Sequence, residues 1–161
     1  MRNLEKMKFI IALALNILII TFDVNAQRDT RHYEVAHGYN ETVAKRYLDN
    51  NDLDLIEGIW QSSDGFKYAI EKNVDEFGIR LSDSYRVIIL EVTNRNTWWQ
   101  PTYIRGFFET GSVEGMYSFK YYQIDRYNNL NIQTALSTMS NPLSLSYVHV
   151  ETNEEQLLYK M

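Results

Sequence analysis

The sequence predicts an all-β domain: a single antiparallel up-and-down barrel of about eight strands, preceded by a short capping helix. Three observations predict it. From Leu55 onwards apolar and polar residues alternate with a period of two, which is typical of strands with one buried face. Turn residues such as Asp64-Gly65 separate the alternating segments. The 12 tyrosines and the many Ile and Val residues favour pleated surfaces.

The first 26 residues are predicted to be an export signal and not part of the fold. The signal consists of a basic segment (Arg2, Lys6, Lys8), an apolar run (9–20) and small residues before a cleavage site (Val24-Asn25-Ala26). A retained membrane anchor is the alternative, but the run falls short of the roughly 20 apolar residues that a spanning helix requires. We therefore expect an exported protein, periplasmic or secreted, with no membrane attachment once the signal is removed.

Residues 27–39 are expected to form a flexible leader, and residues 40–161 the helix-capped barrel domain. Asn40 is a predicted N-cap, which places Glu41 at the positive end of the helix dipole and four residues before Lys45. An apolar stripe at helical spacing follows, made by Val43, Ala44, Tyr47 and Leu48. We expect this stripe to lie against the barrel.

Alternating segments after the helix predict the strands in order. They are 55–62, 66–72, 85–92, 102–110, 116–125, 130–136, 144–152 and 156–161, and residues 78–81 could form a further short strand. Turns are predicted at Ser63-Asp64-Gly65, at Gly111 with Gly115, at Tyr127-Asn128-Asn129 and at Asn141-Pro142. Short hairpins favour the barrel. A β-sandwich is the alternative, and only residues 74–84 are long enough for its crossover connection.

The alternation also predicts which side chains face the interior. They are Trp60, Phe66, Tyr68, Ile70, Ile104, Phe108, Leu130, Ile132 and Tyr147. An eight-stranded barrel can be filled by its own side chains or can hold one small ligand. So many rings predict a filled or nearly filled interior, in which any cavity is small and lined by tyrosine hydroxyls and aromatic faces.

Gly58-Ile59-Trp60 opens the first strand, after a short helix and before an antiparallel meander. This arrangement resembles the lipocalin-like, or calycin, barrels, in which the tryptophan plugs one end beneath a basic side chain near the C-terminus. Lys160 is the matching basic residue here. The pattern also resembles small exported bacterial domains of unassigned function. The resemblance implies a fold and no ligand; unlike typical lipocalins, the chain has no predicted C-terminal helix and no cysteine.

Composition and motifs exclude several classes of function. The formal net charge is −5, which disfavours nucleic acid as a partner because phosphate backbones require clustered cations. The absence of cysteine excludes a thiol nucleophile, a cysteine zinc site and cysteine lipidation. There is no Gly-x-Ser-x-Gly and no glycine-rich phosphate loop. His32, His37 and His149 lack metal-ligand spacing. We therefore expect no catalytic, cofactor-binding or metal-binding residues.

The candidate contacts with a ligand or partner are all aromatic: Trp60, Tyr68, Trp98, Trp99, Phe108 and Tyr147. Trp98-Trp99 is the most unusual pair, because consecutive side chains of a strand face opposite ways and one indole should leave the core. We expect a non-enzymatic barrel that binds a small apolar or aromatic ligand, or a protein or glycan partner. The alternative is an accessory domain or inhibitor of a secreted hydrolase, or a hydrolase with weak motifs.

Overall fold

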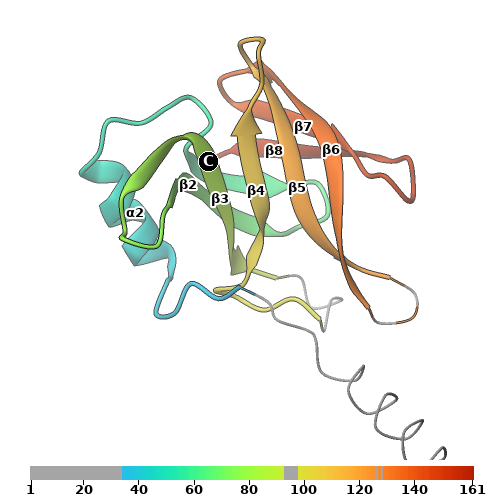
Figure 1. The fold of residues 1–161 in the computed structure, drawn as a ribbon, viewed down its shortest axis with the longest axis horizontal. Coiled ribbons are helices and arrows are strands. Elements are labelled where there is room, and N and C mark those ends of the chain that lie inside the picture. The colour runs from blue at the N-terminus through green and yellow to red at the C-terminus, as the bar shows by residue number, and fades with distance from the viewer. Residues whose placement is uncertain (1–33, 93–97, 126, 128) are drawn as a thin grey trace, which may run out of the picture. The chain divides into compact units, whose positions relative to one another are not determined.

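Eight antiparallel strands close into a barrel in the computed structural model, in which each strand pairs with the next along the chain and β8 returns to β1 (Figure 1). The structure describes residues 34–92, 98–125, 127 and 129–161. The predicted signal, the first part of the leader and His32 lie outside the described residues. The predicted all-β up-and-down barrel is confirmed.

The elements follow the predicted order. They are α2 (Glu41–Asp49), β1 (Gly58–Ser62), β2 (Lys67–Val74), β3 (Arg80–Glu91), β4 (Ile104–Thr110), β5 (Met116–Ile124), β6 (Leu130–Asn141), β7 (Ser144–Val148) and β8 (Glu155–Lys160). Strands β3 and β6 are longer than predicted, and β1 and β7 are shorter.

The stretch before β3 decides between barrel and sandwich. The backbone N–H of Asp75 donates to the carbonyl of Ile79 at 2.9 Å, and the Asp75 carboxylate accepts from the N–H groups of Phe77 and Ile79. These bonds close a hairpin, so β3 begins at Arg80 and pairs directly with β2. No crossover connection is left for a sandwich within residues 74–84.

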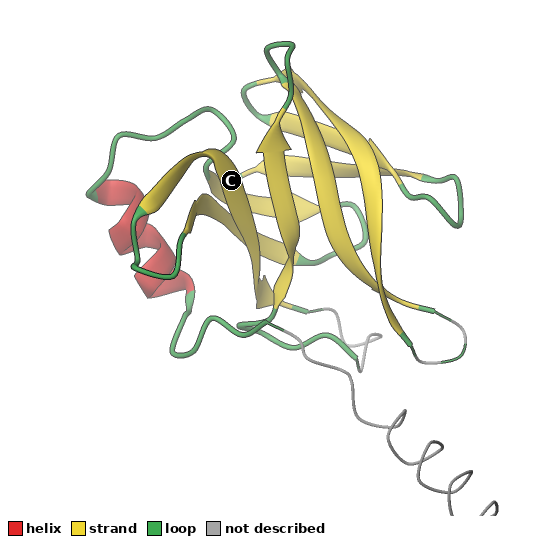
Figure 2. Cartoon of the chain, viewed as in Figure 1, coloured by secondary structure: helices red, strands yellow, loops and turns green. Residues whose placement is uncertain are grey.

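Helix α2 begins at the predicted cap, because the Asn40 side chain accepts a hydrogen bond from the N–H of Val43 at 3.1 Å. The helix lies outside the barrel, beside β2 and β3 in the view of Figure 2. Its fully buried Ala44 packs with Ile59 and Ala69 on the outer face of the sheet. The two alanines at this contact allow the helix to approach the sheet closely.

Two buried carboxylates, Glu57 and Glu71, form hydrogen bonds with side chains on the helix side of the barrel. We call the carboxylates and their side-chain partners the tyrosine–carboxylate seam (Tyr39, Tyr47, Glu57, Glu71, Arg86). The Tyr47 hydroxyl donates to Glu57 at 2.6 Å, and two backbone N–H groups donate to the same carboxylate. Glu71 accepts from the Tyr39 hydroxyl at 2.5 Å and from two nitrogens of Arg86. Both carboxylates are buried, and both are fully hydrogen-bonded.

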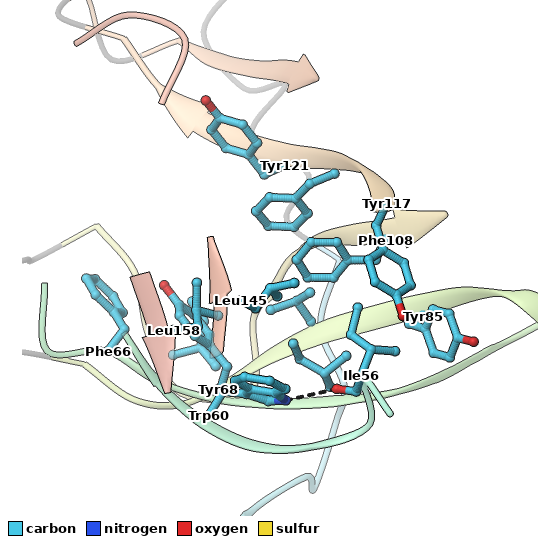
Figure 3. Close-up of a cluster of buried hydrophobic side chains, with 14 of the residues drawn as sticks. Ile56, Trp60, Phe66, Tyr68, Tyr85, Phe108, Tyr117, Tyr121, Leu145 and Leu158 are labelled. Carbon is cyan, nitrogen blue, oxygen red and sulfur yellow. Dashed lines mark hydrogen bonds between the residues drawn. The ribbon is translucent and has the colours of Figure 1, made fainter. Parts of the chain in front are cut away.

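The barrel interior is a continuous cluster of mostly aromatic side chains (Figure 3). Phe108 stacks on Phe119 with ring centroids 4.1 Å apart, and Phe119 stacks in turn on Tyr121 at 5.2 Å. Phe108 and Tyr121 are completely buried. These rings pack against one another in the middle of the barrel.

The inward assignment of Ile132 is wrong. Ile132 is 66% exposed and Leu136, on the same face of β6, is 63% exposed. Ala135 and Ser137 face inward instead, opposite Phe119 and its neighbours. Apolar residues occupy both faces of this strand, so the alternation alone could not fix which face is buried.

Candidate ligand site at the Arg105 end

The two ends of the barrel differ in construction. In this strand order the β2–β3, β4–β5 and β6–β7 connections lie at one end, which we call the Trp60 end. The β1–β2, β3–β4, β5–β6 and β7–β8 connections lie at the other, which we call the Arg105 end. Among the described residues, the buried side-chain atoms that lack a hydrogen-bond partner all belong to the second end.

Trp60 closes its end as a plug. The ring is completely buried, and its indole N–H donates to the Ile56 carbonyl at 2.9 Å, the dashed line in Figure 3. The Lys160 ammonium lies 5.5 Å from the ring centroid and donates to the Leu55 carbonyl at 2.8 Å. Gly58 leaves room for that lysine, because a Cβ there would meet Lys160 Cε at 2.5 Å. The pairing of Trp60 with Lys160 suggested by the sequence is present.

Arg105 points into the barrel because of a bulge in β4. Val87 pairs with Gly106, but the next residue, Ile88, pairs with Ile104, so Arg105 is the extra residue. Its guanidinium lies 4.4 Å from the centroid of the buried Trp99 ring. The bulge therefore turns a charged side chain from the outer face into the interior.

The same bulge overturns the inward assignment of Ile104. Ile104 is buried, but it pairs with Ile88, whose neighbours Val87 and Ile89 face the interior, so both Ile104 and Ile88 lie on the outer face. The described end of the leader covers this position: the N–H of Ile104 donates to the Glu34 carbonyl at 2.8 Å. The alternation across 102–110 missed the extra residue.

Gly106 makes the bulge possible. A Cβ at this position would lie 2.3 Å from the Lys120 carbonyl oxygen and 2.7 Å from the Tyr121 Cα. Strands β4 and β5 thus approach each other too closely here for any other residue. The close approach also brings Tyr121 beneath Arg105, whose guanidinium lies 5.4 Å from the Tyr121 centroid.

Three buried side-chain atoms without a hydrogen-bond partner have been found among the described residues: Arg105 Nη1, Gln123 Oε1 and His149 Nδ1. All three belong to side chains of the Arg105 end, and we call them the open-end cluster. The His149 ring lies 5.6 Å from that of Tyr121. Gln123 follows Tyr121 by two positions on the inward face of β5. Such orphaned atoms are rare in folded proteins, and each costs free energy.

The charge of Arg105 acts on the ionisable groups around it. Burial lowers the pKa of His149 below its ordinary range, and the nearby positive charge of Arg105 lowers it further. Burial raises the pKa of Tyr147 to about 12, with Arg105 acting in the opposite direction. Burial raises the pKa of Tyr68 as well, again partly offset by Arg105. His149 is thus neutral at neutral pH and Arg105 is the cation of the open-end cluster.

The structure distributes the six aromatic candidates along the barrel. Trp60 lies at the closed end and Phe108 in the middle. Trp99 and Tyr147 lie near Arg105 at the other end. Tyr68 pairs with Trp60 across β1 and β2, and its hydroxyl interacts with Arg105. Trp98 is 42% exposed, while its neighbour Trp99 is buried in the core. One indole of this pair is therefore exposed and the other is buried, although neither residue lies in a strand.

Two surface depressions lie elsewhere on the barrel, away from the open-end cluster. One of about 220 Å³ is lined by Leu55, Tyr117 and Met139 among others, at the Trp60 end. Another of about 350 Å³ lies over the paired strands β3 and β4 and is lined by Ser84 and Glu109 among others. Neither is lined by an atom of the open-end cluster.

Sequence reasoning missed Arg105 and Gln123 and treated His149 as an ordinary strand histidine. One signal was present: Arg105-Gly106 puts a glycine inside a predicted strand, which is typical of a bulge or of a close backbone approach. No comparable signal marks Gln123, because its missing partner depends on which strands surround it.

No family model, no curated protein and no solved structure matches this chain. Among the described residues, no group of three or more His, Asp or Glu side chains could hold a metal ion. No helix in the described part of the chain has the length and hydropathy to cross a membrane. Fold and site together define a class: a small eight-stranded up-and-down barrel with one plugged end and one end bearing unpartnered polar groups.

Proposed function

We propose that the protein is an exported, lipocalin-like, non-enzymatic binding protein that holds a small ligand with an apolar or aromatic body at the Arg105 end of its barrel. One observation carries the proposal: the partly buried Arg105 and His149 and the buried Gln123 each keep one buried polar atom without a partner, at a single end of an otherwise aromatic barrel. Binding sites combine apolar walls with a few polar groups that orient the ligand.

The rest of the site supports the same conclusion. Trp99, Tyr121 and Tyr147 supply aromatic surfaces around the polar atoms. The plugged Trp60 end and the stacked rings of the middle leave the Arg105 end as the place for a ligand. The basic and apolar segments of residues 1–26 favour export, and the match of Gly58, Trp60 and Lys160 to the lipocalin pattern favours that relationship.

A second candidate rests on Trp98. An indole that is 42% exposed beside the mouth of the barrel is a typical contact for a protein or glycan partner. In that case the protein would act as an accessory domain or an inhibitor of a secreted hydrolase, through the rim and not through the interior.

Titration with N-phenyl-1-naphthylamine, a neutral aromatic probe, tests the proposal. The protein contains three tryptophans, one at the closed end and two at the Arg105 end, and single Trp→Phe variants assign their indole N–H signals by NMR. We expect saturable binding with one probe per barrel that shifts the Trp99 signal and leaves that of Trp60 in place. A shift confined to Trp60, or no saturable binding, would overturn the proposal. A shift confined to Trp98 would instead favour the partner surface.

A further inference from the structure

One nitrogen of the Arg105 guanidinium, Nη1, is buried without an acceptor, and it points to the chemistry of the ligand's polar end. The guanidinium also has a side-chain hydrogen bond with Tyr68, which leaves Nη1 as its open donor. None of the ion pairs found among the described residues includes Arg105. A buried donor atom of a charged group is costly to leave without an acceptor, and proteins satisfy such donors internally or with a ligand. The aromatic rings of Trp99 and Tyr121 stabilise the cation through their faces, but they leave Nη1 without an acceptor.

We propose that the ligand is an amphipathic monoanion, an apolar or aromatic body ending in a carboxylate or similar oxyanion, whose charged group binds Arg105. This inference rests on the binding function proposed above. The planar guanidinium offers parallel N–H donors whose spacing matches the two oxygens of a carboxylate. The contact with the Trp99 ring restricts the guanidinium before the ligand arrives, so less conformational freedom is lost on binding.

The neighbours of Arg105 favour one negative charge over two. His149 is neutral at neutral pH, so it adds a hydrogen-bonding group and no second cation. Asp64, in the β1–β2 hairpin of the same end, acts electrostatically on Tyr68, Tyr147 and His149. Its negative charge opposes a dianion such as a phosphate monoester. The Gln123 amide carries both a donor and an acceptor, and it can form a further hydrogen bond with the charged group of the ligand.

A matched pair of probes tests the inference. 1-Anilinonaphthalene-8-sulfonate has the same aromatic body as N-phenyl-1-naphthylamine and adds one sulfonate. We expect the native protein to bind the sulfonate probe at least about tenfold more tightly, as a charge-assisted bond in a buried site allows. In Arg105→Met this preference should disappear while the neutral probe still binds. Arg105→Lys, which keeps the positive charge but loses the two parallel N–H donors of the guanidinium, should give an intermediate preference.

Lys120→Met is the control for non-specific attraction. It removes one exposed positive charge from the outer face of the same barrel, and it should leave the preference unchanged. A second pair, decanoate and decanamide, repeats the test with a carboxylate by displacement of the neutral probe; decanoate should compete at least about tenfold better.

The outcomes separate the two proposals. Equal affinities of the native protein for the two naphthyl probes, or a preference that survives in Arg105→Met, would overturn the anion inference while leaving the binding function intact. Failure of both probes to bind the native protein would overturn the binding function and the inference with it. Circular dichroism of each variant verifies that the barrel has formed.

Discussion

The tyrosine–carboxylate seam and the open-end cluster both contain a charged group with buried polar atoms, but these atoms have partners only in the seam. Glu71 lies between Arg86 and Tyr39 with short hydrogen bonds to both, and Glu57 is equally satisfied. Arg105 has aromatic faces around it and an unpartnered nitrogen. A buried carboxylate whose partners are all internal is costly to deprive of one of them. Under the function proposed above, the missing partner of Arg105 Nη1 is supplied by the ligand.

The largest expected effect concerns the seam. Glu71→Gln leaves the Arg86 guanidinium half-buried without its countercharge, and removing one member of a buried pair costs about 3–5 kcal/mol. We expect a loss of at least about 3 kcal/mol in the free energy of unfolding, measured by urea denaturation. Glu109→Gln is the control, because its pair with Lys120 is exposed and such pairs contribute about 1 kcal/mol or less. Equal losses in both variants would mean that the seam is not the structural element described.

Arg105→Met should have a much smaller effect on stability. The variant loses a cation–π contact worth up to about 2 kcal/mol, but it also removes an unsatisfied buried donor that costs about 1–3 kcal/mol. Methionine keeps the apolar stem in place. We expect the free energy of unfolding to stay within about 1 kcal/mol of the native value or to rise. A loss as large as that of Glu71→Gln would show that Arg105 is part of the structural framework.

The smallest effect is a pH dependence at the helix. Glu41 accepts from Lys45 at 2.7 Å and from Lys67 at 2.6 Å, and these bonds lower the pKa of its carboxyl to about 2. A depressed carboxyl pKa contributes stability that is fully present above the ordinary value of 4.5 and is lost as pH falls toward 2. Glu41→Gln should therefore flatten the decline of the urea midpoint between pH 5 and pH 2. An unchanged decline would assign it to other carboxyls, such as Asp54, whose pKa is lowered by the Tyr85 hydroxyl and by Lys72.

Part of the candidate site could be predicted and part could not. Trp60 and Lys160 were found from a local motif, because the glycine before the tryptophan and the basic residue near the end of the chain are visible in the sequence. Trp99 was found because two adjacent tryptophans must point apart. Arg105 was missed because it is the extra residue of a bulge in β4. Strict alternation assumes no extra residue, so it assigns the wrong face to Arg105 and to the residues before it in the strand.

The sequence by itself determined the strands, the tight turns and the helix cap, because these depend on neighbours within a few residues: the two-residue alternation, the Asp64-Gly65 turn and the Asn40 side chain. Only the tertiary structure decided that Arg105, Gln123 and His149 share one end of the barrel. They come from three different strands or strand ends, and the absence of an internal partner is a property of the closed barrel as a whole. Hydrogen-bond satisfaction depends on which atoms surround a group, and those atoms are distant in the chain.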